Sequence, residues 1–176
     1  MSLGLSIRPW ALDDIPVIIN YFLEASDEHK KGMGVDSTLL PSYEKWYDSL
    51  IGEIDQDPHS QGLYYLIWMI DDLAVGHSNV NFIEYGHKAH MHLHLWKSQR
   101  RRAGMGTAFV KKCIPVFFER FDLRYLICEP YAENPAPNKT LPKAGFTFVK
   151  EYNTIPGPLN FRQDVRRYRI DRKDVI

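Results

Sequence analysis

The spacing of apolar and polar residues predicts an opening strand and two helices in the first third of the chain. A short extended run at residues 5–10 is followed by an apolar run at residues 15–22, and acidic residues just before that run suit the first turn of a helix. Residues 42–54 predict a second helix, with Ser42 as its N-cap. The polar stretch at residues 24–41 predicts a long loop, and long loops in compact domains are often binding elements.

The middle of the chain has the pattern of an antiparallel meander followed by a helix. Three runs rich in Tyr, Ile, Val and Trp, separated by turn residues, predict strands at residues 63–70, 73–82 and 89–96. Apolar residues then recur every three to four positions from Met105 to Phe121, which predicts a helix. Pro115 lies inside that helix, so we expect it to kink or loosen one turn.

The last third predicts a mixed ending of strands and one short helix. Extended runs at residues 124–129, 147–152 and 165–170 predict strands. Pro142 lies in the helical segment between the first two and should keep that helix short or distorted. The order of elements predicts an α/β or α+β protein, with residues 1–176 forming one domain.

Composition narrows the classes of function. The formal net charge is zero, so no global field attracts nucleic acid or anionic lipid, and we expect neither as a partner. The two cysteines, Cys113 and Cys128, lie in apolar stretches without metal-ligand spacing, which argues against a disulfide framework and favours a reducing cytoplasm. No run approaches the roughly 18 apolar residues of a membrane helix, and no signal peptide is evident.

A basic, glycine-containing turn precedes the central helix. Its residues are Arg101, Arg102, Ala103, Gly104, Met105 and Gly106. Glycines let a backbone approach a ligand closely, a helix N-terminus presents free N–H groups, and arginines add cationic donors. The turn therefore predicts a diphosphate cradle. A solvated basic turn and a nucleic-acid patch are the alternatives, and neither a P-loop nor a Rossmann pattern is present.

At this point the sequence resembles a known family. Arg101-x-x-Gly104-x-Gly106 is similar to the acetyl-CoA loop of the GNAT acetyltransferases. The segment from Asn134 to Phe146 resembles that family's Asn-x-x-(Ala/Ser)-x-x-x-(Leu/Tyr)-Glu-Lys-x-Gly-Phe segment, in the Leu form common in the RimJ/RimL-like branch. The tripeptide at residues 128–130, Cys-Glu-Pro, resembles a segment found in the aminoglycoside and siderophore acetyltransferase branches of the family.

The resemblance implies the GNAT fold and acetyl-CoA as cosubstrate, with no metal. The sheet would be mixed and mostly antiparallel, with about six to seven strands, about four flanking helices and a splayed central pair that admits the pantetheine arm. The cofactor-binding residues would be Leu95, Trp96, Arg101, Arg102, Ala103, Gly104, Met105, Gly106, Thr107 and Asn134. Many family members carry a Tyr as general acid where this chain has Leu141, and Tyr131 is a substitute candidate.

The family's acceptor usually meets the first helices and a late hairpin, here residues 24–41 and 153–164. Asp27, Glu28 and Asp36 in the first segment would attract a cationic amine, although for each residue taken singly a solvated loop with ordinary charge is the favoured interpretation. The late hairpin would be a lid or a dimer contact. We expect a monomer or a homodimer.

Histidines alternate along the strand at residues 89–96. Because side chains alternate across a strand, His90, His92, His94 and Trp96 share one face. An attacking amine must be neutral, and histidine is the natural proton acceptor at pH 7. His90 and His92 also fall where serotonin N-acetyltransferase carries its His-x-His pair, so we assign His92 as base, His90 as relay and His94 as the imidazole nearer the thioester.

Two other interpretations of these histidines stay open: a solvated sheet face, and a metal site completed by His77 or His94. The leading prediction is acetylation of a primary amine by direct attack in a ternary complex, because the two cysteines look buried and offer no acetyl-enzyme route. The alternatives are acetylation of a protein N-terminus and a non-catalytic acyl-CoA-binding module. An enclosed acidic pocket would favour a small amine, and an open, shallow groove a protein.

Overall fold

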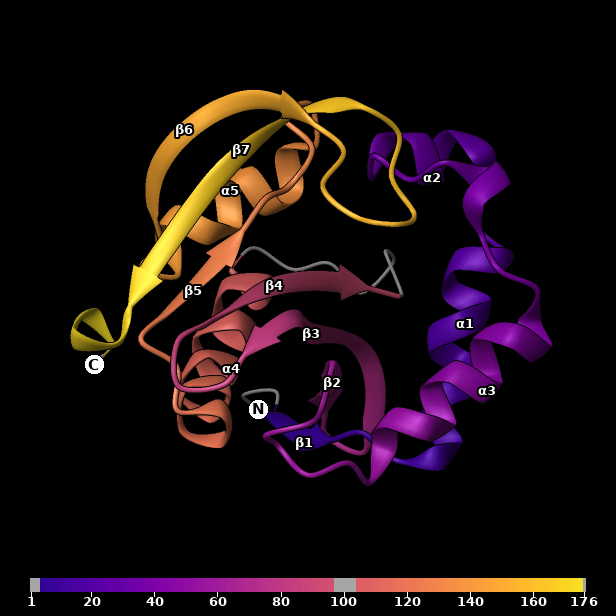
Figure 1. Ribbon diagram of the computed structural model, residues 1–176, viewed down its shortest axis with the longest axis horizontal. Helices are drawn as coiled ribbons and strands as arrows, with labels where there is room; N and C mark the ends of the chain where they lie inside the picture. The colour runs from indigo at the N-terminus through magenta and orange to yellow at the C-terminus, as the bar shows by residue number, and fades with distance from the viewer. Residues whose placement is uncertain (1–3, 97–103, 176) are drawn as a thin grey trace.

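The computed structural model describes residues 4–96 and 104–175, which form one seven-stranded sheet with helices against it (Figure 1). The strand order is β1-β2-β3-β4-β5-β7-β6; β4 and β5 are parallel, and every other neighbouring pair is antiparallel. The strands are β1 Leu5–Pro9, β2 Leu63–Ile70, β3 Leu73–Glu84, β4 Lys88–Leu95, β5 Tyr125–Cys128, β6 Thr147–Thr154 and β7 Gln163–Asp171. The α-helices are α1 Ile15–Leu23, α2 Asp27–Gly32, α3 Tyr43–Ile54, α4 Met105–Phe121 and α5 Pro135–Lys143.

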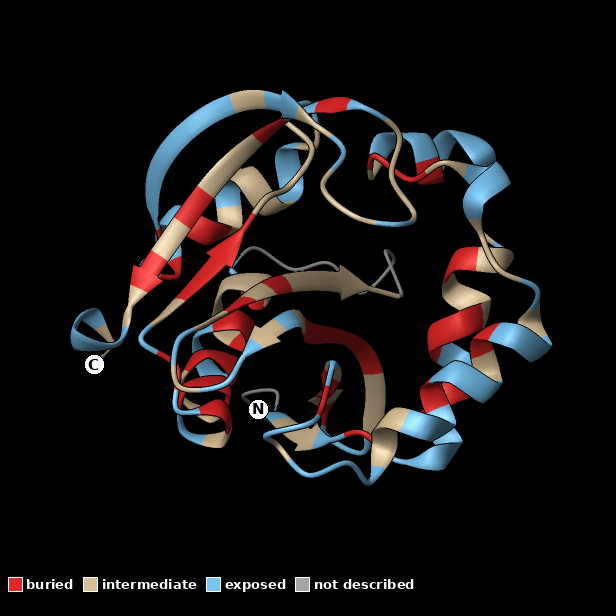
Figure 2. Ribbon diagram, in the orientation of Figure 1, coloured by how far each residue is buried: buried red, intermediate tan, exposed pale blue. Residues whose placement is uncertain are grey.

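The two faces of the sheet are covered by different helices. On one face, the ring of Trp68 in β2 stacks on Phe109 of α4 with centroids 4.9 Å apart. On the other face, Phe22 of α1 lies edge-on to His94 of β4, with centroids 5.1 Å apart. Buried residues therefore concentrate on α4 and β3, whereas β6 is largely exposed (Figure 2). Because side chains alternate along β4, its histidines lie on the same face of the sheet as α1.

The sequence prediction was wrong about residues 24–41, which are not a continuous loop. They contain α2 and a turn of 3-10 helix at Ser37–Leu39. Ser26 caps α2 by accepting a hydrogen bond from the His29 N–H at 3.2 Å, and Asp36 caps the second turn through the Thr38 N–H at 2.9 Å. Short polar side chains that cap short helices leave no apolar periodicity, so the pattern concealed both elements.

Prolines lie within both α4 and α5, and neither helix is interrupted by them. Pro115 does not interrupt α4, which runs from Met105 to Phe121. Pro142 lies one residue before the end of α5, a helix of only nine residues, which agrees with the prediction of a short helix. Pro135 occupies the first position of α5, where the missing N–H has no intrahelical partner to lose.

The sheet splays open at its centre, as the resemblance implied. β4 and β5 pair only between Lys88–His90 and Tyr125–Ile127. Beyond His90, β4 continues to Leu95 without a pairing to β5. On its other edge β4 stays close to β3, where Gly76 permits the approach: a Cβ on that residue would lie 2.4 Å from the carbonyl oxygen of His94. The parting of β4 from β5 creates the space that the functional site occupies.

Candidate functional site

A cavity of about 910 Å³ opens at the splay between β4 and β5. One end is formed by the start of α4 and by α5. The other end reaches α1, α2 and the middle of β2 and β3. Leu93 and His94 of β4 line the stretch between the two ends. The cavity therefore joins a helix N-terminus to the histidine-bearing face of the sheet.

The α4 end has the geometry of an anion site. Gly104 is the N-cap residue of α4 and has φ +83°, a left-handed conformation that glycine adopts without strain. Met105, Gly106 and Thr107 open the helix and line the cavity, and the first N–H groups of a helix have no intrahelical acceptor. Arg101, Arg102 and Ala103 lie outside the described residues. The described part of the predicted cradle fits a diphosphate.

α5 adds charge and a cap to the same end. Lys139 and Lys143 line the cavity there and supply cations. Asn134 also lines it, and its side-chain oxygen accepts a hydrogen bond from the Ala136 N–H at 3.3 Å. Asn134 therefore fixes the start of α5 beside the cavity, at the place the resemblance assigns to the cofactor arm.

The backbone of β4 offers donors on the open side of the splay. The Trp96 N–H donates to the Val75 carbonyl at 2.9 Å, so it points toward β3. Backbone direction alternates along a strand, so the N–H groups of Leu93 and Leu95 point away from β3 and toward the cavity. Of the two predicted cofactor-binding residues on this strand, Leu95 therefore turns its N–H toward the space where a thioester would lie, whereas Trp96 does not.

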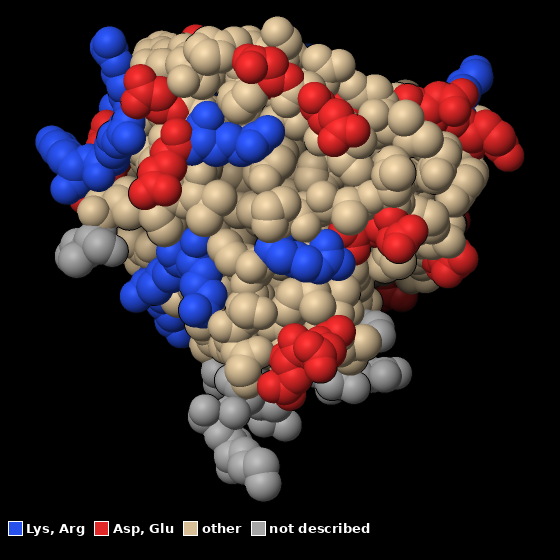
Figure 3. Space-filling model, turned by 90° about the horizontal axis from the view of Figure 1, so that it is seen from below, with Lys and Arg blue, Asp and Glu red and all other residues tan. Residues whose placement is uncertain are grey.

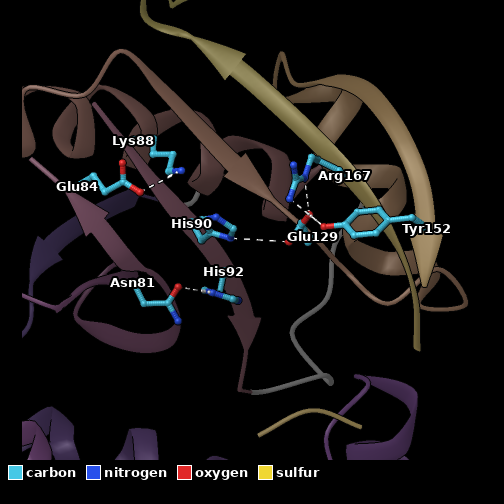
Figure 4. A network of polar contacts seen from close by, with 8 residues as sticks. All are labelled: Asn81, Glu84, Lys88, His90, His92, Glu129, Tyr152 and Arg167. Carbon is cyan, nitrogen blue, oxygen red and sulfur yellow. Dashed lines mark hydrogen bonds and ion pairs between the residues drawn. The ribbon is translucent and has the colours of Figure 1, made fainter. Parts of the chain in front are cut away.

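The three histidines of β4 separate into two environments. His92 and His94 line the cavity, whereas His90 turns toward the end of β5 (Figure 4). The Nε2 atom of His92 lies 3.0 Å from Oδ1 of Asn81 in β3. Because a carbonyl oxygen can only accept, this contact places the ring proton on Nε2 and leaves Nδ1 as the basic atom. Asn81 was not anticipated from the sequence.

Burial holds the imidazoles of His92 and His94 neutral. Loss of solvent lowers the pKa of His92 to about 4 and that of His94 to about 3, with smaller contributions from neighbouring imidazoles. The pKa of His77, directly opposite His94 on β3, is also lowered by burial. The Trp96 indole N–H donates to Nδ1 of His77 at 2.8 Å, which places the His77 ring proton on Nε2.

Glu129 is a second site residue that sequence reasoning missed. It follows β5, its side chain is 7% exposed, and it lines the cavity. Its carboxylate accepts hydrogen bonds from Arg167, at 2.5 Å, and from the Tyr152 hydroxyl, and it lies 3.8 Å from Nδ1 of His90 (Figure 4). Only the parallel register of β4 and β5 brings this residue to the histidine strand.

Only one of the three carboxylates predicted to bind the acceptor lines the cavity. Glu28 of α2 lines the cavity, but Asp27 and Asp36 are absent from its lining. Asp27 accepts a hydrogen bond from the Ser37 hydroxyl at 2.9 Å, and Asp36 holds the N–H and hydroxyl of Thr38. Both carboxylates are therefore engaged in shaping the α2 segment.

The late hairpin is tied across the cavity to the α2 segment. The loop between β6 and β7, residues 155–162, supplies the Leu159 carbonyl to the Asp36 N–H at 2.8 Å. The side chains of Asn160 and Gln163 both donate to the Gly34 carbonyl, at 2.9 and 2.7 Å. We call these three hydrogen bonds the latch. Figure 1 shows the loop reaching α2 above the end of β4.

The position of the family's usual general-acid tyrosine holds Leu141 in this chain. Leu141 is completely buried in the core. Tyr131 does line the cavity, and its hydroxyl donates to Glu133 at 3.0 Å, which raises the pKa of Tyr131. Cys113 and Cys128 are buried free thiols; burial raises the pKa of Cys113 to about 12 and that of Cys128 still further, so neither supplies a thiolate at neutral pH.

Two further observations concern metals and membranes. Among residues 4–96 and 104–175, no group of three or more His, Cys, Asp or Glu side chains is arranged to hold a metal ion. Within the same residues, no helix has the length and apolar character needed to cross a bilayer. Basic and acidic side chains both occur on the face seen from below in Figure 3, as the zero net charge suggests.

A sheet splayed at its centre, with a glycine-started helix at the opening, defines an acetyl-CoA-dependent transferase of the GNAT class. The chain matches the model of the acetyltransferase (GNAT) domain over residues 5–147, and it belongs to this family. It is thus an N-acetyltransferase that uses acetyl-CoA as cosubstrate.

Solved structures share the fold at low sequence identity. Spermidine N-acetyltransferase from Vibrio cholerae, in complex with CoA and spermine, aligns with a TM-score of 0.78 at 15% identity over 97% of both chains. RimL, a ribosomal L7/L12 alpha-N-protein acetyltransferase in complex with CoA, gives 0.74 at 18% identity over 97% of this chain and 95% of its own. An aminoglycoside acetyltransferase with CoA and kanamycin gives 0.72 at 12% identity over 97% and 96%. No curated protein sequence matches the chain.

Proposed function

We propose that this enzyme acetylates the primary amine of a small molecule by direct attack on acetyl-CoA in a ternary complex. The observation that carries the proposal is the latch, which joins two segments that line the acceptor end of the cavity. The latch joins the α2 segment to the β6–β7 loop, and the wall beneath it includes buried Trp46 and His77. A polypeptide N-terminus would have to part these hydrogen bonds to enter from that side, whereas a small amine would not.

The residues around the cavity take defined roles in this mechanism. The diphosphate of the cosubstrate lies at the start of α4, and the pantetheine arm follows the open edge of β4. The N–H of Leu95 polarises the thioester carbonyl as negative charge develops on its oxygen. His92 lies on the acceptor side with Nδ1 as proton acceptor, because Asn81 holds Nε2–H.

The reaction balances without a covalent enzyme intermediate. The neutral amine attacks the thioester carbonyl, a C–N bond forms, and the C–S bond breaks with the electron pair leaving on sulfur. The amine proton passes to His92 Nδ1 and from there to solvent, with His90 and Glu129 next along the strand edge. The CoA thiolate takes its proton from solvent or from Tyr131, which lines the cavity.

The second candidate is acetylation of a protein N-terminus. RimL shares the fold and is named for that activity, whereas two other neighbours are named for spermidine and aminoglycosides. The likeness to each supports the fold and leaves the acceptor open. The latch is the feature of this chain that favours the small amine.

The test is acetyl-CoA turnover with a panel of small primary amines and an N-terminal peptide. We expect transfer to small amines, and a His92→Ala rate lower by about 10²–10⁴-fold with unchanged acetyl-CoA affinity. His59→Ala is the matched control, since this histidine lies at the surface beside Asp57. Normal turnover by His92→Ala would refute the assignment of the base, and exclusive transfer to the peptide would refute the small-amine acceptor.

The cofactor site is tested by Gly104→Glu, with Gly86→Glu as control. Both glycines have positive φ, +83° and +74°, with nothing within 4 Å of an added Cβ, so the backbone strain is matched. Only Gly104 lies at the cavity. We expect Gly104→Glu to abolish CoA binding, because its carboxylate meets the diphosphate, and Gly86→Glu to retain it. Equal binding by both variants would contradict the placement.

A further inference from the structure

The acceptor end of the cavity is walled by rings. Around His94, the rings of Tyr21, Phe22 and His77 have centroids 5.5, 5.1 and 5.0 Å away. Tyr65 lies 5.0 Å from His77 and extends the same wall. All five side chains line the cavity. The imidazoles among them are kept neutral by burial, so this wall presents apolar and uncharged polar surface to an acceptor.

The carboxylates that line the cavity are either paired with other side chains or exposed to solvent. In the described lining, the carboxylates are those of Glu28, Glu129 and Glu133. Glu129 is paired with Arg167, and Tyr152 donates to it as well. Glu28 and Glu133 are exposed, and Glu133 already accepts from Tyr131. Of the three, Glu28 alone has no ion pair or hydrogen bond among the described residues, and its exposed side chain lies on α2 and is not one of the five that form the wall of rings.

From this distribution we infer that the acceptor is a monoamine with an uncharged, apolar or aromatic body, and not a polyamine. The inference rests on the proposed function and narrows its substrate class. The reacting amine gives up its charge before attack, so it needs no carboxylate. A second ammonium lying against the rings would lose its water and gain only cation–π contacts, with no carboxylate to neutralise it. That net cost applies to every polycationic acceptor.

The sharpest probe is a pair of amines that differ by one charge. Hexylamine and 1,6-diaminohexane have the same chain, and their amino groups have pKa values of about 10, so their reactive fractions are similar. We expect kcat/KM for hexylamine to exceed that for the diamine by about tenfold or more, after correction for the diamine's two equivalent amines. Equal or better turnover of the diamine would overturn the inference and leave the proposed function standing. If neither amine nor any other small amine is acetylated while acetyl-CoA binds, the proposed function itself fails.

A charge placed in the wall should change this preference. Met33 lines the cavity, is half-buried, and accepts a hydrogen bond from the Tyr21 hydroxyl at 3.2 Å. Met33→Glu should shift the kcat/KM ratio toward the diamine by about fivefold, because the new carboxylate partners the second ammonium. Met33→Gln, of the same shape without charge, should leave the ratio unchanged. A ratio that moves equally in both variants would show that charge is not what the wall selects.

Discussion

Burial of His94 should make this protein lose stability in mild acid, and the loss can be isolated in one variant. The folded state holds the pKa of His94 at about 3, against 6.5 in an unfolded chain. Between these values the unfolded state binds a proton that the folded state does not. Stability therefore falls as the pH falls below 6.5, and it continues to fall until the pH reaches the folded value.

The size of the effect follows from the two pKa values. At pH 5 the unfolded chain gains RT ln(1 + 10^1.5), which is about 2 kcal/mol, and at pH 7 the same term is about 0.2 kcal/mol. His94→Asn removes the titrating group but keeps a polar side chain. The free energy of unfolding of the wild type should therefore fall by about 2 kcal/mol more than that of His94→Asn between pH 7 and pH 5.

Urea unfolding at the two pH values measures this difference. Each protein is compared with itself, so any packing lost in the variant cancels. If wild type and His94→Asn lose stability in parallel, to within about 0.5 kcal/mol, the imidazole is not desolvated as the structure requires.

Two glycines make further predictions. Gly76→Ala should lower stability by about 1–3 kcal/mol in urea unfolding and weaken CoA binding, because the new Cβ would lie 2.4 Å from the His94 carbonyl oxygen and push β4 from its place; wild-type values for both would contradict the close strand approach. Gly34→Ala should open the latch, because this residue has φ +77° and a Cβ there would lie 2.1 Å from the side-chain oxygen of Gln163. We expect faster amide hydrogen exchange in the β6–β7 loop and a lower Tm, because an alanine at this φ is strained, and unaltered exchange would show that the latch does not depend on this glycine.

The sequence determined most of the fold because its signals are local. Apolar periodicity located α1, α3 and α4, and the bounds of the strands agree with the predicted runs to within a few residues. The strict alternation of β4 placed His92 and His94 on one face without any tertiary information. Gly104 at the start of α4 marked the cofactor end for the same reason, since a left-handed residue before a helix is a local backbone feature.

The tertiary structure decided what surrounds that strand. Glu129 reaches His90 only because β5 runs parallel to β4 in one register, and Asn81 reaches His92 only because β3 pairs with β4. The latch joins residues 126 and 129 positions apart, Gly34 with Asn160 and with Gln163. Pairing register and long-range hydrogen bonds depend on how whole elements pack. No local pattern encodes them, so the latch and the contacts of Glu129 and Asn81 were visible only in the folded chain.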